Sequence, residues 1–208
     1  MKITVRADKS AVEIEGYVNA VGRDSRTLTD EHGYPYKEQM EPGVFARAIA
    51  AKNGQDIPML LDHDYDHVIG GTSSNLTLEE DSIGCHALAV VTDPDVIKKA
   101  EAKKLRGWSF GFIPLDYRDV YTSEGDRKII TEMELVEVTL VDDEMVPVYA
   151  GTSVHTRAEG EEPQKIHLRT KDDDVIYHII EERAAKPEES RTIDYSQYEE
   201  TINRLKSH

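Results

Sequence analysis

The stretch Gly107–Phe112, with the sequence GWSFGF, places one hydroxyl inside an apolar, aromatic segment that contains two glycines. Side chains alternate along an extended strand, so we expect Ser109 and Phe112 on opposite faces. Glycine lets another backbone, such as a bound peptide, approach closely. Ser109 is either a small core residue or a nucleophile, and a serine nucleophile needs an adjacent base. The catalytic interpretation therefore depends on a base elsewhere in the chain.

A candidate base follows the short apolar strand expected at Ile57–Leu61. His63 comes directly after this strand and lies between Asp62 and Asp64. A neighbouring carboxylate stabilises the imidazolium form, which suits a general base. A polar loop with surface histidines would give the same sequence, so the pattern alone does not decide between the two.

The same segment offers a metal site as an alternative. Its potential ligands are Asp62, His63, Asp64 and His67. The two histidines have the four-residue spacing that faces one side of a helix. The preceding strand and the pair Gly70–Gly71 argue against a helix, and a metal would require a defined ligand set. We therefore expect no bound metal.

An acidic residue lies in the strand-forming segment Glu132–Val141. Alternation puts Leu135, Glu137 and Thr139 on one face, and Val136, Val138 and Leu140 on the other. Glu137 is then either solvated at a sheet edge or buried with a partner, because an unpaired buried charge is costly. A buried Glu137 would be available to orient a histidine.

The remaining pattern over residues 1–150 predicts a mainly β fold with two helices. Helices are expected over Met40–Asn53 and from the N-cap Asp93 and Pro94 up to Gly107. Gly22–Gln39 reads as a long polar loop. Further strands are predicted at Ile3–Ala7, Val12–Ala20, Leu76–Glu80, Ile83–Val91, Trp108–Tyr117, Lys128–Thr131 and, as a last short element, Met145–Ala150.

The composition excludes several classes of function. With 25 Lys and Arg against 41 Asp and Glu in 208 residues, the net charge is −16, which disfavours nucleic-acid binding. A basic peptide would be a better partner, although most of these charges are expected to be solvated. The single cysteine, Cys85, suits a reducing compartment. Neither a signal-peptide core nor an apolar run of about 20 residues is present, so we expect a soluble, intracellular protein with no membrane partner.

The composition changes after Gly151, where we place a domain boundary between 1–150 and 151–208. Thr152–Gln164 has the composition of a polar linker. Helices are predicted over Asp172–Ala185, from apolar residues at helical spacing, and over Tyr195–Lys206. The segment 151–208 is thus expected to be a detachable helical tail.

Five motifs, in this order, resemble the phage prohead protease family, the capsid-maturation serine proteases that are related to the herpesvirus assemblins. They are similar to that family's P-G-x-F, L-x-x-H-D, G-x-S-x-G-F and L-x-E-V-S-L-V segments, preceded by an opening strand. In this chain they lie within about residues 12–150, at Gly16–Val18, Glu41–Phe45, Pro58–Asp64, Arg106–Phe112 and Leu135–Val141.

The resemblance implies a closed, mostly antiparallel β-barrel flanked by a few helices. It implies peptide-bond hydrolysis without a cofactor, with Ser109 as nucleophile and His63 as general base and then acid. Assemblins use a second histidine as third member, whereas the matching late strand here offers Glu137 as the orienting acid. Other candidates for that position remain open: Asp62, Asp64, Asp142 and His86.

The implied substrates are the major capsid protein, the scaffold and the protease itself, within the assembling procapsid in the host cytoplasm. The tail would be removed by self-cleavage or would anchor the enzyme to the scaffold. A homo-oligomer is compatible with the sequence, which does not fix the oligomeric state. Two alternatives remain: a catalytically silent capsid-assembly scaffold, and a metal-dependent hydrolase that uses residues 62–67.

Overall fold

The computed structural model describes residues 1–123, 125–143, 152–155, 164–170 and 175–180. These ranges contain two helices, α1 (Val44–Ala51) and α2 (Pro94–Glu101). Their strands are β1 (Lys2–Val5), β2 (Val12–Ala20), β3 (Leu28–Thr29), β4 (Pro35–Met40), β5 (Pro58–Leu61), β6 (Asp64–Gly71), β7 (Leu76–Glu80), β8 (Gly84–Val91), β9 (Leu105–Val120), β10 (Asp126–Asp142), β11 (Thr152–His155), β12 (Gln164–Thr170) and β13 (Ile176–Ile179).

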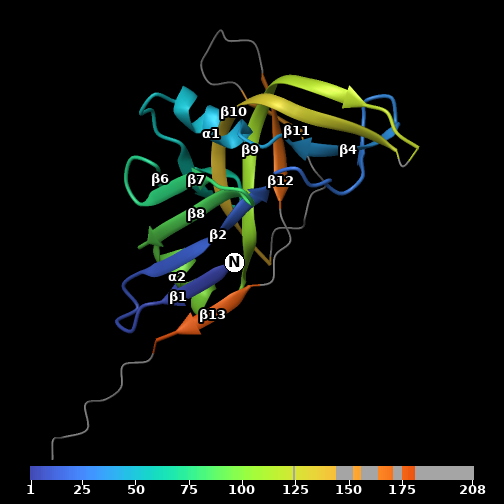
Figure 1. Ribbon diagram of the computed structural model, residues 1–208. Coiled ribbons are helices and arrows are strands. Elements are labelled where there is room, and N and C mark those ends of the chain that lie inside the picture. The colour runs from blue at the N-terminus through green and yellow to red at the C-terminus, as the bar shows by residue number, and fades with distance from the viewer. Residues whose placement is uncertain (124, 144–151, 156–163, 171–174, 181–208) are drawn as a thin grey trace, which may run out of the picture.

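The strands form two sheets (Figure 1). One has the order β13-β1-β2-β8-β7, and the other follows β11-β12-β9-β10-β4-β3, with β5 and β6 attached to β10. A closed barrel requires the end strands to pair, and within the described ranges no ladder joins the ends of either sheet or links the two sheets. The expected closed barrel is therefore not supported, and the fold is mainly β with two helices.

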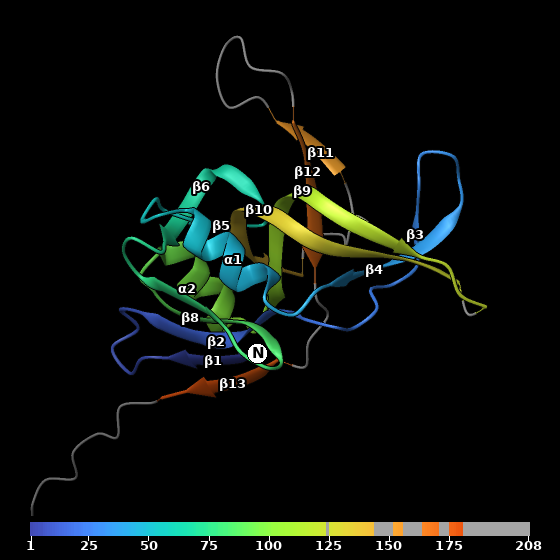
Figure 2. The same cartoon turned by 45° about the horizontal axis from the view of Figure 1, so that its top comes forward.

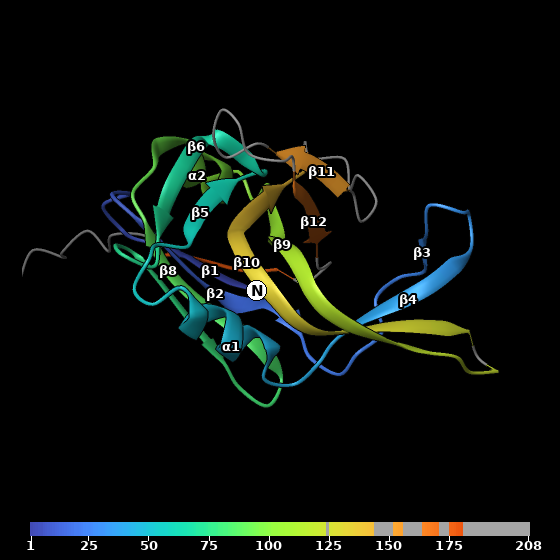
Figure 3. The ribbon, with the colours of Figure 1, turned by 90° about the horizontal axis from the view of Figure 1, so that it is seen from above.

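The long hairpin of β9 and β10 is the centre of the second sheet. β10 pairs with β9 along nearly its whole length. On its other side, its first residues pair in parallel with β4 and its last residues pair in parallel with β5. The far end of the hairpin projects away from the rest of the protein, with β3 and β4 beside it (Figures 2 and 3). β10 therefore holds β9 and β5 in fixed positions relative to each other.

Aromatic side chains on one face of β9 form much of the core. Trp108, Phe110 and Phe112 are fully buried and alternate with Ser109 and Gly111. The Phe110 ring lies 5.2 Å from the ring of Phe45 on α1 and 5.4 Å from that of Phe112. This packing buries one face of β9 in the core and leaves Ser109 on the other face, as the alternation predicted.

Both predicted helices are present, and the start of α2 is capped as expected. The Asp93 carboxylate accepts hydrogen bonds from the backbone N–H groups of Asp95 and Val96, and Pro94 is the first helical residue. The long loop predicted over residues 22–39 contains β3 and most of β4 instead. β4 is stabilised by its parallel ladder with β10, a non-local partner that the local sequence does not indicate.

The predicted helix over 172–185 is wrong in its described part. Ile176–Ile179 form β13, which pairs in parallel with the edge of β1. The side chains alternate between the faces of the strand: Val175 and Tyr177 pack against the core, while Ile176 on the other face is exposed. The expected linker likewise contains β11 and ends in β12. The predicted elements at 145–150 and 195–206 lie outside the described residues, and the domain boundary at 150 stays a prediction.

Replacing Tyr177 by Phe tests how β13 is attached. The Tyr177 hydroxyl donates a hydrogen bond to the Leu105 carbonyl at 2.6 Å. Its loss should lower the free energy of unfolding by about 1 kcal/mol in a urea titration. Tyr121→Phe is the matched control, because Tyr121 is 76% exposed, and it should change stability by less than about 0.5 kcal/mol. Equal effects of the two substitutions would contradict the docking of β13.

Candidate active site

His63 lies in a two-residue hairpin turn between β5 and β6. Asp62 and His63 both have left-handed backbone conformations, with φ of 53° and 59°, the φ pattern of a type I′ turn. Such conformations are strained for residues other than glycine and persist when neighbours fix them. Here the Asp62 N–H donates to the Leu140 carbonyl at 2.8 Å, and the His63 N–H donates to the Thr139 hydroxyl at 3.0 Å. Both acceptors belong to β10, so this strand sets the position of the imidazole.

Glu137 reaches the same place because β10 carries a bulge. Leu135 pairs with Phe112 and Glu137 pairs with Gly111, so one additional residue of β10 is accommodated between these pairs. The bulge places Leu135 on the core face and Glu137 on the opposite face, next to Thr139. The prediction that Leu135 and Glu137 share a face was therefore wrong, because a register shift reverses the alternation.

Gly111 leaves room for the Glu137 side chain. A Cβ atom at this position would lie 2.6 Å from Glu137 Oε1, which is closer than real carbon atoms approach. Any side chain at residue 111 would displace the carboxylate. The glycine noted in the sequence thus serves close approach, in the first place by an acidic side chain.

Ser109, His63 and Glu137 form one hydrogen-bonded chain. His63 Nε2 lies 2.7 Å from Ser109 Oγ, and His63 Nδ1 lies 2.7 Å from Glu137 Oε1. The Ser109 and Glu137 side chains have no exposed surface, and that of His63 is 6% exposed. An ionised carboxylate only accepts hydrogen bonds, so it fixes the proton on Nδ1 and leaves Nε2 to accept the serine proton. This arrangement provides a hydroxyl, a base and an orienting acid.

The four other candidates for the third member of the site, three aspartates and one histidine, make contacts elsewhere. Asp62 Oδ1 accepts a hydrogen bond from the Asp142 N–H at 2.9 Å, and Asp142 pairs with Lys99. Asp64 is exposed and accepts a hydrogen bond from the Asp66 N–H. His86, on β8, lies near Glu15 and Tyr17.

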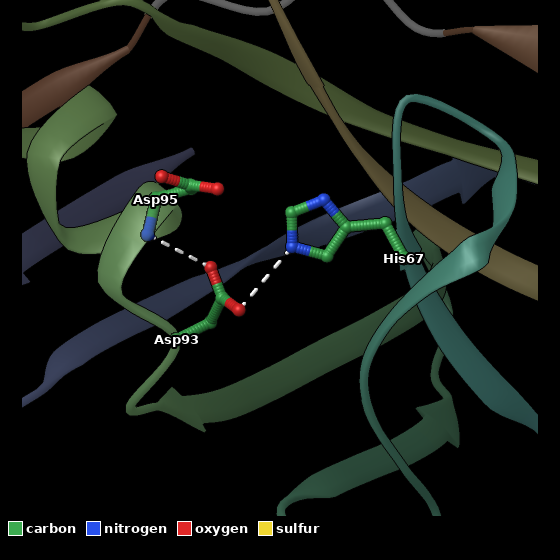
Figure 4. Close-up of side chains that lie close together, drawn as sticks. All are labelled: His67, Asp93 and Asp95. Atoms are coloured by element: carbon green, nitrogen blue, oxygen red, sulfur yellow. Dashed lines mark hydrogen bonds and ion pairs between the residues drawn. The ribbon is translucent and has the colours of Figure 1, made fainter.

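The proposed metal ligands of residues 62–67 are not assembled as a set. Within the described ranges, the group whose atoms lie close enough to hold an ion is His67, Asp93 and Asp95, within 4.8 Å of one another. Figure 4 shows the contacts that these side chains make with each other and with α2. His67 Nε2 lies 3.2 Å from the Asp93 carboxylate, and Asp93 caps α2. The helix cap and the contact between His67 and Asp93 account for the positions of these two side chains.

Sequence reasoning missed Arg169, whose backbone contacts Ser109, and its partner Glu38. Ser109 Oγ donates a hydrogen bond to the Arg169 backbone carbonyl at 2.8 Å, and the Arg169 side chain forms an ion pair with Glu38. Glu38 falls in the segment expected to be a loop, and Arg169 in the segment expected to be a detached tail. Neither carries a sequence motif that would have linked it to Ser109.

The buried hydroxyl–imidazole–carboxylate chain has the geometry that serine hydrolases use, here carried by a mainly β fold. A comparison with family models supports the same class, since the model described as caudovirus prohead serine protease matches residues 1–166. The chain therefore belongs to the caudovirus prohead serine protease family, as its motifs indicated. Searches of curated proteins and of solved structures give no significant match.

Removing the charge of Asp62 tests the electrostatics of the turn that carries His63. Burial, with the nearby Asp142 charge adding to it, raises the pKa of Asp62 above its usual 3.8. The folded state then holds this proton more tightly than the unfolded state, so wild-type stability is lost as the pH rises from 3.8 through the raised pKa. Asp62→Asn escapes this loss and keeps an oxygen for the Asp142 N–H.

The free energy of unfolding of Asp62→Asn minus that of wild type should therefore increase between pH 3 and pH 7, in urea titrations at each pH. Asp66→Asn, an exposed aspartate on the neighbouring strand, gives the baseline for the exchange. A difference that stays flat or decreases with pH would show that Asp62 is not held as described.

Proposed function

We propose that this protein is a serine endopeptidase whose catalytic residues are Ser109, His63 and Glu137. The observation that carries the proposal is the continuous hydrogen-bonded chain from Glu137 through His63 to Ser109, with both links at 2.7 Å. Membership of a serine peptidase family supports it independently of the geometry. The mechanism needs no cofactor.

In this mechanism Ser109 Oγ attacks the carbonyl carbon of a peptide bond while its proton passes to His63 Nε2. The C–N bond then breaks, and His63 gives the proton to the leaving amine. A water molecule attacks the acyl-enzyme in the same way, which releases the acid product and restores Ser109. Glu137 holds the imidazole orientation and stabilises its charged form.

The family implies capsid proteins as substrates and action within the assembling procapsid. We propose that the major capsid protein precursor and the scaffold are cleaved, and that the protein also cleaves itself. In the described part of the chain no helix is long and apolar enough to cross a membrane.

Replacing Ser109 by Ala should remove the activity while the fold is kept. Loss of the nucleophile is expected to lower the rate by at least about 1,000-fold. The measurement is intact-mass spectrometry after incubation with the precursor of the capsid protein, with circular dichroism as a check of folding. Ser82→Ala is the matched control, since Ser82 is exposed in the β7–β8 turn. Fragments that form equally with Ser109→Ala would exclude the proposed nucleophile.

Replacing Glu137 by Gln tests the third member. The Gln amide group can donate to His63 Nδ1 and so favour the tautomer whose Nε2 is already protonated. We expect kcat to fall by about 10⁴-fold, with little change in the fold. Asp64→Asn is the control, and it should leave kcat within about threefold because Asp64 is exposed. If the two variants exchanged these effects, the orienting acid would be Asp64.

A further inference from the structure

The edge of β9 beside Ser109 is occupied by a strand of the same chain. β12 pairs with β9 in antiparallel register, with Thr170 opposite Ser109 and Leu168 opposite Gly111. Figures 1 and 3 show β12 lying along β9 on the side away from β10. An extended peptide that adds to an exposed strand edge is a common mode of peptide recognition. β12 is bound to β9 in this mode.

The backbone carbonyl group of Arg169, on β12, contacts the proposed nucleophile. Ser109 Oγ donates a hydrogen bond to its oxygen at 2.8 Å. A hydroxyl has one proton, which attack requires to pass to His63 Nε2 instead. In a productive complex the carbonyl carbon faces Oγ. β12 therefore occupies the position of a substrate strand in an arrangement that holds the nucleophile inactive.

The Arg169 side chain is bound as specifically as its backbone. Its Nε and Nη2 atoms donate to the two oxygens of Glu38 at 2.7 and 2.9 Å. Glu38, on β4, is 3% exposed, and the guanidinium group also lies 5.5 Å from the centre of the Phe112 ring. A planar fork on a carboxylate, beside an aromatic face, is a site that selects arginine over other side chains.

We propose that the edge of β9 is the substrate groove, that Glu38 is a specificity-determining residue for an arginine beside the scissile bond, and that β12 occupies this groove as an internal pseudosubstrate. This inference rests on the proposed peptidase function. The preferred substrate is an extended peptide with arginine at the place that Arg169 takes.

If β12 left the groove, the exposed groups would favour binding of an extended peptide with arginine. The buried Glu38 carboxylate would lose the two hydrogen bonds of its guanidinium partner, and a buried charge without a partner is costly. The backbone N–H and C=O groups of β9 that pair with β12 would also lose their hydrogen-bond partners. The family match ends at residue 166, so most of β12, including Arg169, lies beyond the matched region. A substrate strand with arginine would replace each of these interactions.

The specificity is tested with three internally quenched peptides. One has the sequence of residues 164–173, QKIHLRTKDD, and the other two carry Ala or Glu in place of its arginine. We expect the full-length protein to cleave the arginine peptide with kcat/KM at least about tenfold above that of the alanine peptide. Glu38→Gln should reduce this ratio to about one while it still cleaves the alanine peptide. Glu79→Gln, at an exposed position on β7, should keep the ratio.

The outcomes separate the two proposals. No arginine preference in wild type, or the same preference in Glu38→Gln, would overturn the specificity proposal alone. Cleavage of the capsid precursor but of none of the peptides would also overturn it and leave the peptidase function intact. If neither the precursor nor any peptide were cleaved, the peptidase function itself would fail.

The occupancy of the groove is tested by loosening β12. Arg169→Ala removes the anchor, so it should raise the rate at which the full-length protein cleaves the arginine peptide by about tenfold. Arg169→Lys keeps the charge but loses the bidentate hydrogen bonds to Glu38, so it should give a smaller increase in the cleavage rate. If β12 were only a structural strand, both variants would lower the activity, and that result would overturn the pseudosubstrate proposal.

Discussion

The burial of one carboxylate constrains the arrangement of this protein. Glu137 has no exposed surface and lies in β10 between buried apolar residues, where an unpaired charge would cost several kcal/mol. His63 Nδ1 supplies the partner at 2.7 Å. This contact requires the turn after β5 to lie over β10, and β10 meets the requirement by pairing with β5 on one side and with β9 on the other. One strand thus carries the acid and positions the two strands that lead to the histidine and the serine.

Local irregularities make this contact sterically feasible. The bulge in β10 rotates Glu137 away from the face of Leu135, and Gly111 leaves the volume that the carboxylate occupies. The left-handed turn at Asp62 and His63 directs the imidazole between the acid and Ser109. Each of these features is unfavourable or neutral for a regular sheet. Their coincidence around one hydrogen-bonded chain is the strongest structural argument for a functional role.

The sequence predicted the elements whose signals are local. The capped start of α2 and the alternating strands on either side of Ser109 follow from residue type and spacing. The motifs also selected Ser109, His63 and Glu137, which the fold brings together. The bulge in β10 was missed because Leu135 and Val136 are both apolar, so the pattern does not show where the alternation changes phase.

β4, β12 and β13 were missed because distant partners stabilise them. Each adds to the edge of a strand far away in the chain, and the segment containing β13 has apolar residues spaced in a way that also suits a helix. Glu38 and Arg169 were missed for the same reason: their ion pair joins residues 131 positions apart.

The proposed occupation of the groove by β12 sets a condition on when the enzyme can act. A segment that is tethered to the same chain competes with an effective concentration on the order of millimolar. Dilute peptides would displace it only slowly, whereas substrate chains held around the protein at comparable concentrations would compete with it effectively. Glu38 adds a chemical condition, since a competing strand without arginine would leave its buried carboxylate without the paired contact that Arg169 provides. Strand pairing and charge recognition would then act together to confine cleavage to places where the correct substrate is concentrated.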